Sequence, residues 1–389
     1  MTINLTPDPT LDDSPTMTRT ELRASGSLAS IFALRMLGLF LVLPVFALEA
    51  RKYPGGDDPA LIGLAMGIYG LTQGLLQIPF GMASDRLGRK RVIIFGLLVF
   101  ALGSLIAGSA DTLTGLLVGR SVQGAGAVSA AVTALLADLT RDSVRTKAMA
   151  LVGASIGLMF ALSLVVSPVI AAHIGLSGLF VLTAVLALLG TAVVVWGVPT
   201  EPQAHKDAAR GGLRHVLSSP ALLRLNIGVF VLHAVQLAMW VAIPAFLVQA
   251  GLGKDDHWQI YLPAVLGSFV LMGGVFPLER RGYLRAVFLS AIALIALVQV
   301  ALLWVSSGAP SITCLAWLLF AFFCGFNVLE ATQPSLVSRI APAASRGAAM
   351  GVYNTLQSLG FFAGGVMGGQ LVKSYGTQGL FLTCAALMV

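Results

Sequence analysis

Between two long apolar runs the chain reads GMASDRLGRKR, residues 81–91. One interpretation is a basic loop that only fixes the direction in which the chain inserts into a membrane. That interpretation explains the basic residues after Asp85, but not the placement of Gly81, Asp85 and Gly88. Gly81 at a helix end permits close approach of a neighbouring helix, and a carboxylate such as Asp85 is stabilised by the N-terminal dipole of a nearby helix. We therefore interpret this loop as a functional contact between helices.

The apolar character on either side of this loop extends through the whole chain. Of its 389 residues, 57% are hydrophobic and 11% are charged, and the mean hydropathy is +0.89. Soluble domains average about 25% charged residues, which disfavours a soluble enzyme, a nucleic-acid-binding protein and a disordered protein. A backbone inside lipid must satisfy its own polar groups, so we predict an all-α integral membrane protein. The net charge of +7 is then explained by basic loops on one side of the membrane.

Runs of about 20 apolar residues, the length that a spanning helix needs, occur eleven times. They cover residues 26–48, 61–83, 92–109, 112–137, 149–171, 178–198, 221–248, 259–278, 286–306, 312–335 and 350–372. A twelfth run begins near Gly379 and reaches Val389, which is about half a span. We predict twelve transmembrane helices, the last of them incomplete in this chain, and no cleavable signal peptide.

Lysine and arginine are distributed unequally between the two sets of loops. If the N-terminus is cytoplasmic, seventeen basic residues fall on the cytoplasmic side. The opposite side holds four, namely Arg51, Lys52, Lys254 and Lys373. Because positive residues concentrate in cytoplasmic loops, we predict that both termini are cytoplasmic.

The chain divides near its middle into two similar parts. Residues 199–220 form a polar stretch, which we interpret as a cytoplasmic linker between six-helix halves at 26–198 and 221–389, after a cytoplasmic tail at 1–25. Two short patterns recur at nearly the same separation: residues 85–88 match 279–282, and 145–149 match 346–350. Such an internal repeat is typical of transporters with a central cavity.

Residues 81–91 resemble the loop between the second and third helices of the major facilitator superfamily, G-x-x-x-D-R-x-G-R-R/K. Further segments are similar to its drug:proton antiporter type: LRMLG at 34–38, GIYGLTQ at 67–73, DLTR at 138–141, RTKAM at 145–149 and AMGVY at 349–353. The resemblance implies the major facilitator fold, with 12 transmembrane helices as two six-helix halves. It also implies a secondary transporter.

A second family pattern lies in the fourth span, RSVQGAGA at 120–127. An Arg inside a span costs roughly 2.5–3.5 kcal/mol on insertion scales, so Arg120 must face a cavity or a polar partner. In proton antiporters of this family R-x-x-Q-G-x-G is associated with proton transfer, and the role of an Arg there is electrostatic. The alternative is a structural Arg satisfied by backbone carbonyls.

The Gly-rich pattern that antiporters usually carry in the fifth span is absent. Small residues stand in its place, and they also permit close packing: Ala154, Ser163, Ser167, Ala171 and Ala172. Glycines are instead concentrated in the eleventh span, where we predict a packing face formed by Gly360, Gly364, Gly365, Gly368 and Gly369.

Four ionisable residues deep in the spans are candidates for proton coupling: Arg35, Arg120, His233 and Glu330. They lie in spans one, four, seven and ten, which surround the cavity in this family. A membrane carboxylate with a raised pKa can load and release a proton near neutral pH. We place Glu330 about five residues above the cytoplasmic end of its span. A structural role, with hydrogen bonds to neighbouring helices, is the alternative for each of them.

Two weaker groups complete the candidate residues. The first is a conformational latch on the cytoplasmic side, in which the resemblance pairs Arg89 with Asp138. The alternative for Asp138 is a solvated carboxylate at a helix end. The expected latch comprises Gly81, Asp85, Arg86, Gly88, Arg89, Asp138 and Arg145. The second group suits an amphipathic organic solute, or packing between helices, and comprises Tyr69, Gln73, Gln77, Gln236, Trp240, Asn354 and Gln357.

We predict a proton-coupled antiporter that exports small organic or drug-like solutes across a bacterial inner membrane by alternating access. The expected partners are H⁺, a small-molecule substrate and the lipid bilayer, with no nucleic acid, and we expect a monomer. No P-loop, metal-ligand pattern or catalytic set occurs in the sequence, so we expect no cofactor, no metal and no enzyme activity, with a proton gradient as the energy source. Uptake by symport of a small metabolite is the main alternative, and a channel is a more distant one.

Overall fold

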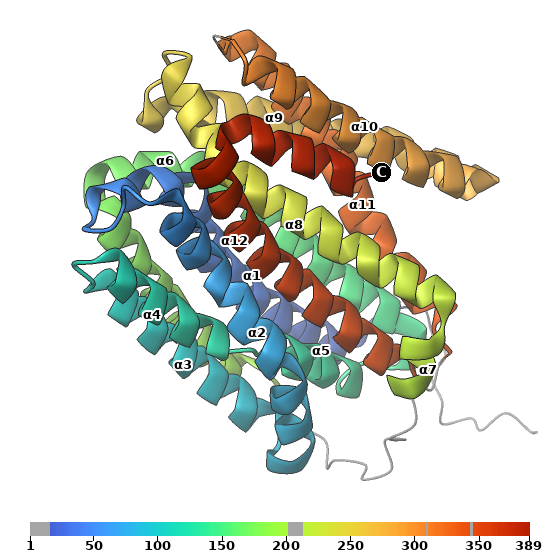
Figure 1. Ribbon diagram of the computed structural model, residues 1–389. Coiled ribbons are helices and arrows are strands. Elements are labelled where there is room, and N and C mark those ends of the chain that lie inside the picture. The colour runs from blue at the N-terminus through green and yellow to red at the C-terminus, as the bar shows by residue number, and fades with distance from the viewer. Residues whose placement is uncertain (1–15, 201–212, 309, 343–344) are drawn as a thin grey trace, which may run out of the picture.

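The structure, a computed structural model, describes residues 16–200, 213–308, 310–342 and 345–389. Every regular element in these ranges is helical (Figure 1). The elements are α1 (Arg19–Glu49), η1 (Ala50–Lys52), α2 (Pro59–Leu87), α3 (Arg89–Gly108), α4 (Leu113–Ala125), α5 (Ser129–Asp138), α6 (Asp142–Ala192), η2 (Val193–Gly197), α7 (Leu213–Ser218), α8 (Pro220–Gln249), η3 (Lys254–Asp256), α9 (Trp258–Leu278), η4 (Glu279–Tyr283), α10 (Leu284–Val305), α11 (Ile312–Ile340) and α12 (Arg346–Leu387). The prediction of an all-α fold is confirmed for this part of the chain.

Eight described helices are long and apolar enough to cross a membrane: α1, α2, α3, α6, α8, α9, α10 and α11. The remaining expected spans fall on other helices. The fourth is shared by α4 and α5, which are each short, and the eleventh lies in α12, whose many glycines lower its hydropathy. The number of twelve spans therefore stays a prediction.

Two glycines divide the longest helices at positions where the sequence separates two spans. Gly175 in α6 has a φ of 67° and Gly376 in α12 has a φ of 66°. Glycine adopts this left-handed region without steric cost, whereas other residues rarely do. The chain therefore changes direction at Gly175, between the expected fifth and sixth spans, and at Gly376, before the expected twelfth.

The glycine-rich helix α12 lies between α2 and α8 (Figure 1). Its glycines form two faces. A Cβ at Gly360 or Gly364 would overlap the backbone carbonyls of α8, and a Cβ at Gly365 or Gly369 would overlap the backbone of α2. The predicted packing face is thus confirmed, and it serves two partners rather than one.

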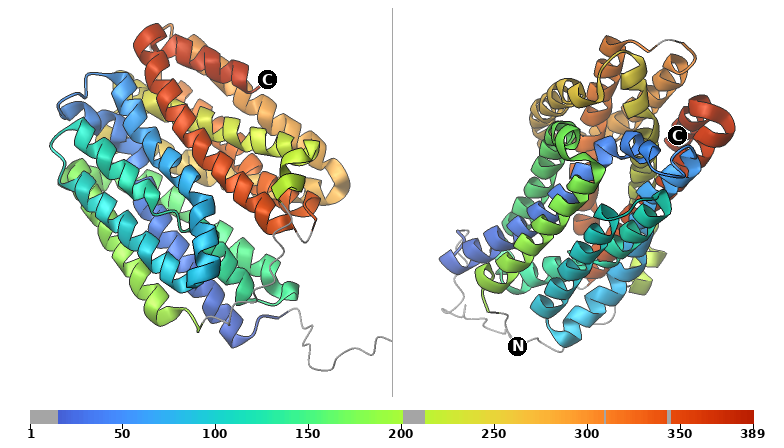
Figure 2. Two further views of the ribbon diagram at one scale, coloured as in Figure 1. Left: turned by 60° about the horizontal axis from the view of Figure 1, so that its bottom comes forward. Right: turned by 90° about the vertical axis from the view of Figure 1, so that its left-hand side faces the viewer.

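Most contacts of the first six α-helices are with one another, and the same holds for α8–α12. We call α1–α6 the N-terminal group and α8–α12 the C-terminal group; they occupy opposite sides of the molecule in the left-hand view of Figure 2. The division into two six-helix halves stays a prediction. Most of the expected linker, residues 201–212, lies outside the described residues.

The two ends of the bundle differ in how the groups meet. We call the end that carries Gly88 the loop end and the end that carries Glu49 the far end. Toward the far end one continuous apolar core contains residues of both groups, including Phe160 and Trp240. At the loop end, separate cores lie around Leu135 in the N-terminal group and around Tyr353 in the C-terminal group. The groups are therefore joined at the far end and separate toward the loop end.

Candidate functional site

Three polar side chains from three helices of the C-terminal group meet inside the bundle. His233 lies in α8, Glu330 in α11 and Gln357 in α12. Gln357 Nε2 donates to Glu330 Oε1 at 3.1 Å and lies 2.8 Å from His233 Nε2. His233 Nε2 lies 3.3 Å from Glu330 Oε2. Two of the four candidates for proton coupling are therefore in direct contact, and Gln357, expected only as a substrate contact, joins them.

The tautomer of His233 follows from its second ring nitrogen. Nδ1 lies 2.9 Å from the Val229 carbonyl oxygen, which accepts hydrogen bonds only, so Nδ1 carries the hydrogen. In the neutral ring Nε2 then has a lone pair, which accepts from Gln357. Glu330 Oε2 faces this same atom and has no hydrogen-bond partner of its own in the structure. Two acceptors therefore face each other across 3.3 Å, an arrangement that one added proton would turn into a hydrogen bond.

The surroundings of the pair are aromatic on one side. The His233 ring lies 4.8 Å from that of Phe361 and 5.8 Å from that of Phe326, both edge to face. The His233 side chain is 2% exposed and that of Glu330 is 37% exposed. The Glu330 side chain is thus partly exposed, although its Oε2 atom is buried, while the imidazole is enclosed.

The depth of Glu330 differs from the expectation. The sequence places it about five residues above the end of its span, but α11 continues to Ile340. At about 1.5 Å per residue, the side chain lies roughly 15 Å from the loop end of its helix. The apolar run ends earlier than the helix because the last turns of α11 are polar.

Arg35 and Arg120 meet in the N-terminal group, on either side of Tyr69. Arg35 donates to the Tyr69 hydroxyl at 2.7 Å and to Ser129 Oγ at 3.3 Å. Arg120 donates to the carbonyl of Met66 at 3.1 Å, and its guanidinium carbon lies 5.1 Å from the centre of the Tyr69 ring. Both arginines are buried. No acidic side chain contacts either of them among the described residues.

The other donors of Arg120 also bind neutral acceptors: Nε donates to the Ala65 carbonyl of α2 at 3.5 Å, and Nη1 binds within the same motif. Arg120 donates to Gln123 Oε1 at 2.9 Å, and Gln123 Nε2 donates to Ser104 Oγ at 2.8 Å. A Cβ at Gly124 or Gly126 would overlap the neighbouring helices α2 and α3. The geometry resembles the alternative from the sequence, an Arg satisfied by backbone carbonyls, with the Gln123 side chain as a further acceptor. The motif glycines bring the helices close enough to supply these partners.

The expected substrate contacts are mostly buried in this state. Gln77, Gln236 and Trp240 are at most 3% exposed, and Trp240 packs edge to face against Tyr261. Gln73 Oε1 and both amide atoms of Gln77 have no hydrogen-bond partner. Asn354 and Gln357 are partly exposed in α12. Of this set, the structure brings Tyr69 to the arginines and Gln357 to Glu330, and it does not bring all seven together.

The loop at 81–91 is held by a network within the N-terminal group. Arg89 pairs with Asp85 on one side and with Asp138 on the other, where Nε lies 3.2 Å from Oδ2. Arg89 also donates to Ser84 Oγ at 2.7 Å, a buried partner that the sequence analysis missed. Gly88 has a φ of 95° and makes the turn.

If the expected latch holds the loop end shut, Asp85 should lie near the N-terminus of α12 in the closed state. The structure does not show such a contact among the residues that it describes. The position of a Cβ on Gly81 is 3.5 Å from Ala130 of α5, within its own group, and a Cβ on Gly351 would meet open space. Arg145 donates to the carbonyls of Ala137 and Thr140. Arg86 is exposed. A contact of Asp85 with α12 would therefore require the loop end to close.

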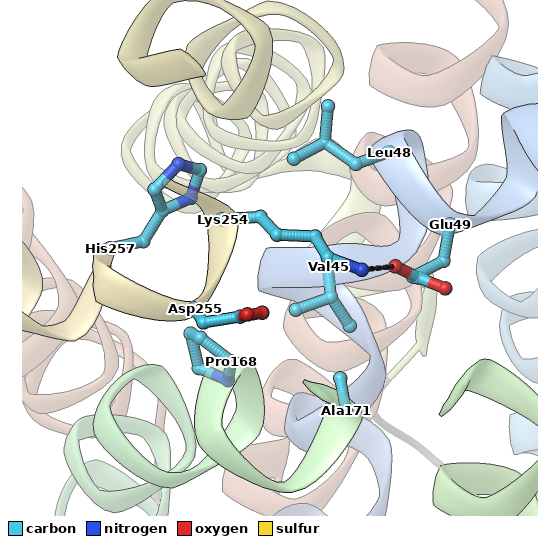
Figure 3. Close-up of a pocket in the computed structure, with 8 residues that line it drawn as sticks. All are labelled: Val45, Leu48, Glu49, Pro168, Ala171, Lys254, Asp255 and His257. Atoms are coloured by element: carbon cyan, nitrogen blue, oxygen red, sulfur yellow. Dashed lines mark hydrogen bonds and ion pairs between the residues drawn. The ribbon is translucent and has the colours of Figure 1, made fainter. Parts of the chain in front are cut away.

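Two ion pairs join the groups at the far end, and the sequence analysis missed both. Lys254 Nζ lies 2.8 Å from Glu49 Oε1, beside a small pocket that His257 also lines (Figure 3). Lys373 Nζ lies 2.8 Å from Asp58 Oδ2. The signal was present, since these lysines are two of only four basic residues expected on that side, and each pairs with an acid at a helix end.

The ion pair with Lys373 affects the protonation of Asp58, which lies outside the helices that are expected to span the membrane. Its hydrogen bond with Lys373 and that from the Ala60 backbone N–H lower the pKa of its carboxyl. Elsewhere in the described residues, no group of three or more His, Cys, Asp or Glu side chains is arranged to hold a metal ion.

Comparison with known proteins identifies relatives over almost the full length. The family model described as Major Facilitator Superfamily matches residues 28–365 and 277–389. The inner membrane transport protein YajR of Escherichia coli (strain K12) is 42% identical over 95% of this chain and 82% of its own length. The multidrug resistance protein MdtH of Aeromonas hydrophila is 26% identical over 86% of this chain and 84% of its own.

Solved structures of the same architecture are much more distant in sequence. A D-xylose-proton symporter matches with a TM-score of 0.75 at 14% identity, over 94% of this chain and 95% of its own. The nucleoside transporter NupG matches with a TM-score of 0.74 at 14% identity, over 95% of this chain and 97% of its own. At this identity the likeness concerns the fold alone.

Proposed function

The chain belongs to the Major Facilitator Superfamily, and from this premise we propose that it is a proton-coupled antiporter that exports small organic or drug-like solutes. Members of this family are membrane transporters and not enzymes. The multi-pass fold therefore carries a small-molecule substrate across a bilayer. The relatives named for multidrug resistance support a drug-like substrate, and the relative named as an inner membrane protein supports a bacterial inner membrane.

The observation that carries the proton coupling is the contact between His233 and Glu330. Two acceptor atoms 3.3 Å apart, in a largely apolar bundle, leave a position for one proton. Without it, the negative charge of Glu330 stays close to the lone pair of His233. With it, the pair is joined by a hydrogen bond. Exchange of a proton here would change the charge of the central region, as alternating access driven by a proton gradient requires.

We propose that both termini are cytoplasmic, so that the loop end faces the cytoplasm. The structure, joined at the far end, then corresponds to the inward-open state. We propose that in this state the proton reaches the pair from the cytoplasm by way of the Glu330 side chain, which is partly exposed and whose Oε2 atom is buried next to His233. We also propose that a monomer is the working unit, that no cofactor is needed and that the proton gradient supplies the energy.

The test uses purified protein in proteoliposomes with an imposed pH gradient, a dye that reports internal pH, and ethidium first in a panel of drug-like compounds. Glu330→Gln should abolish gradient-driven transport and retain substrate counterflow, which needs no net proton movement. Wild-type pH dependence in this variant would exclude Glu330 from coupling, and loss of both activities in a folded variant would indicate a structural role. Movement of protons with the substrate, rather than against it, would establish symport.

A further inference from the structure

We propose that Gln357 is a positioning residue that couples the protonation of the His233–Glu330 pair to the contact of α12 with the N-terminal group. The proposal rests on the proposed role of this pair in proton coupling. Gln357 contacts both members of the pair through one amide nitrogen, and it is the only one of the three residues that lies on α12.

The hydrogens of the Gln357 side-chain amide limit how many acceptors it can bind. The Gln357 amide nitrogen carries two hydrogens. In the deprotonated pair one is donated to Glu330 Oε1, and the other points to His233 Nε2, which is 2.8 Å away. Nδ1 already carries the ring hydrogen, so Nε2 has a single lone pair to offer. In the deprotonated cluster, both hydrogens of the Gln357 side-chain amide are therefore engaged.

An added proton competes with Gln357 wherever it sits. If it sits on Nε2, two N–H donors face each other at the 2.8 Å that separates Nε2 from the amide nitrogen. If it sits on Glu330 Oε2, the new O–H donates to the one lone pair that Gln357 was using. In both cases the amide must turn, so that its oxygen faces the ring, or withdraw. Gln357 thus changes its contacts each time the pair gains or loses a proton.

The change in the contacts of Gln357 occurs on a helix that touches the N-terminal group. The next residue in the chain, Ser358, has its carbonyl against Gly70 of α2, and the Thr355 carbonyl lies near Gly74 of the same helix. A Cβ at Gly70 would overlap the Ser358 carbonyl, and a Cβ at Gly74 would lie 3.1 Å from the Leu359 side chain. Since α12 and α2 touch backbone to backbone here, a rotation of α12 that relieves Gln357 must shift its contact with the N-terminal group.

The other ionisable groups near the cluster do not supply an alternative path. From α12 itself, Tyr353 lies within electrostatic reach of Glu330 and donates to Gln333 Oε1 at 3.5 Å. The face of α2 against α12 presents glycines, whereas its Tyr69 binds Arg35. The basic groups of α8, α10, α11 and α12 lie at least two turns away along their helices or at helix ends: Arg224, Arg285, Arg339, Arg346 and Lys373.

The experiment measures the population of the two states in the full-length protein as a function of pH. A pair of spin labels spans the loop ends of α2 and α12 in a background without native cysteines. Wild type should change its state ratio at least tenfold between the lowest and the highest pH measured. Gln357→Met keeps the length of the side chain but removes its amide, and it should reduce that change to less than threefold. The matched control is Gln370→Met on the same helix, where the exposed amide contacts only Ser374, and it should retain the full change.

The outcomes separate this inference from the proposed function. If Glu330→Gln retains the full pH response, the proton site is elsewhere and the proposed function fails. If Glu330→Gln removes the response but Gln357→Met keeps it, only the role of Gln357 is overturned. Gln357→Asn keeps the amide and should restore part of the response. Should Gln357→Met not fold, Gln357→Glu gives the test: a second carboxylate beside Glu330 should raise the pH midpoint by at least one unit, and an unchanged midpoint contradicts the proposal.

Discussion

The two polar clusters inside the bundle handle buried charge in opposite ways. In the N-terminal group, Arg35 and Arg120 are held by hydroxyl, amide and carbonyl oxygens and by the faces of aromatic rings. In the C-terminal group, His233 and Glu330 face each other with two acceptor atoms and one unfilled hydrogen position. The first cluster keeps its charge at any pH at which proteins work, since arginine stays protonated, although the buried Arg35 Nε has no hydrogen-bond partner. In the second cluster the unfilled position is one that a single added proton would fill.

The difference indicates that the two groups respond differently to a change in protonation. A guanidinium surrounded by neutral dipoles keeps its charge and its contacts, so we expect the N-terminal cluster to keep the same arrangement in both states. The C-terminal cluster changes its hydrogen bonds with each proton. If the proposed proton coupling holds, we expect movement between states to begin in the C-terminal group and to reach the N-terminal group through the contacts of α12 and the far-end ion pairs.

The largest effect is expected at His233. His233→Gln keeps a polar side chain but removes the ring nitrogen that shares the proton with Glu330. Proton-driven transport should fall at least about a hundredfold, which corresponds to about 2.7 kcal/mol. The measurement is the initial rate in proteoliposomes with a fixed pH gradient, beside the thermal midpoint of the purified variant.

The control for His233 is substrate counterflow without a gradient, which should persist. A variant that retains gradient-driven transport would show that Glu330 binds its proton without the imidazole. The comparison between the clusters would then rest on the carboxylate alone.

At Arg35 we expect a loss of stability and no change in coupling. Arg35→Met removes the hydrogen bonds to Tyr69 and Ser129. Hydrogen bonds between membrane helices average about 0.6 kcal/mol in mutational cycles, so the expected destabilisation is about 1–2 kcal/mol. The thermal midpoint should fall while the pH midpoint of transport stays at its wild-type value. A shifted pH midpoint would mean that the arginine charge acts on the proton site across the bundle.

The sequence predicted elements well where one physical cue dominates. Apolar length located most helices, and the glycines of α12 predicted its packing because only close approach explains so many of them. The partners of Arg120 were predicted only as one alternative, since carbonyl acceptors leave no trace in a sequence. Gln357 was noticed for its polarity, but its contact with Glu330 depends on how three helices pack.

At the far end, Glu49→Gln should weaken the junction between the groups. The Glu49 side chain is 5% exposed and pairs with Lys254 of the C-terminal group and Lys52 of its own. Exposed pairs contribute up to about 1 kcal/mol, and this one is more enclosed, so we expect about a fivefold shift toward the outward-open state. Distance labels across the far ends of α1 and η3 measure it. Lys52→Gln, which removes only the pair within one group, is the matched control and should shift the ratio less.

The smallest effect is expected at Asp58, and it depends on pH. Lys373 lowers the pKa of Asp58 in this state; in a state with the far end open the pair is broken, and the pKa returns toward about 4, the ordinary value of an aspartate. The pair therefore favours the joined far end above that pH, and the preference is lost as the pH falls through the lowered pKa. Because both partners are exposed, Asp58→Asn should shift the state ratio less than about threefold at neutral pH. Wild type and variant should converge in acid, where Asp58 is protonated. If Asp58→Asn instead removed the pH response near neutrality, the proton sensed by the protein would bind at the far end, and the contrast between the two central clusters would lose its functional meaning.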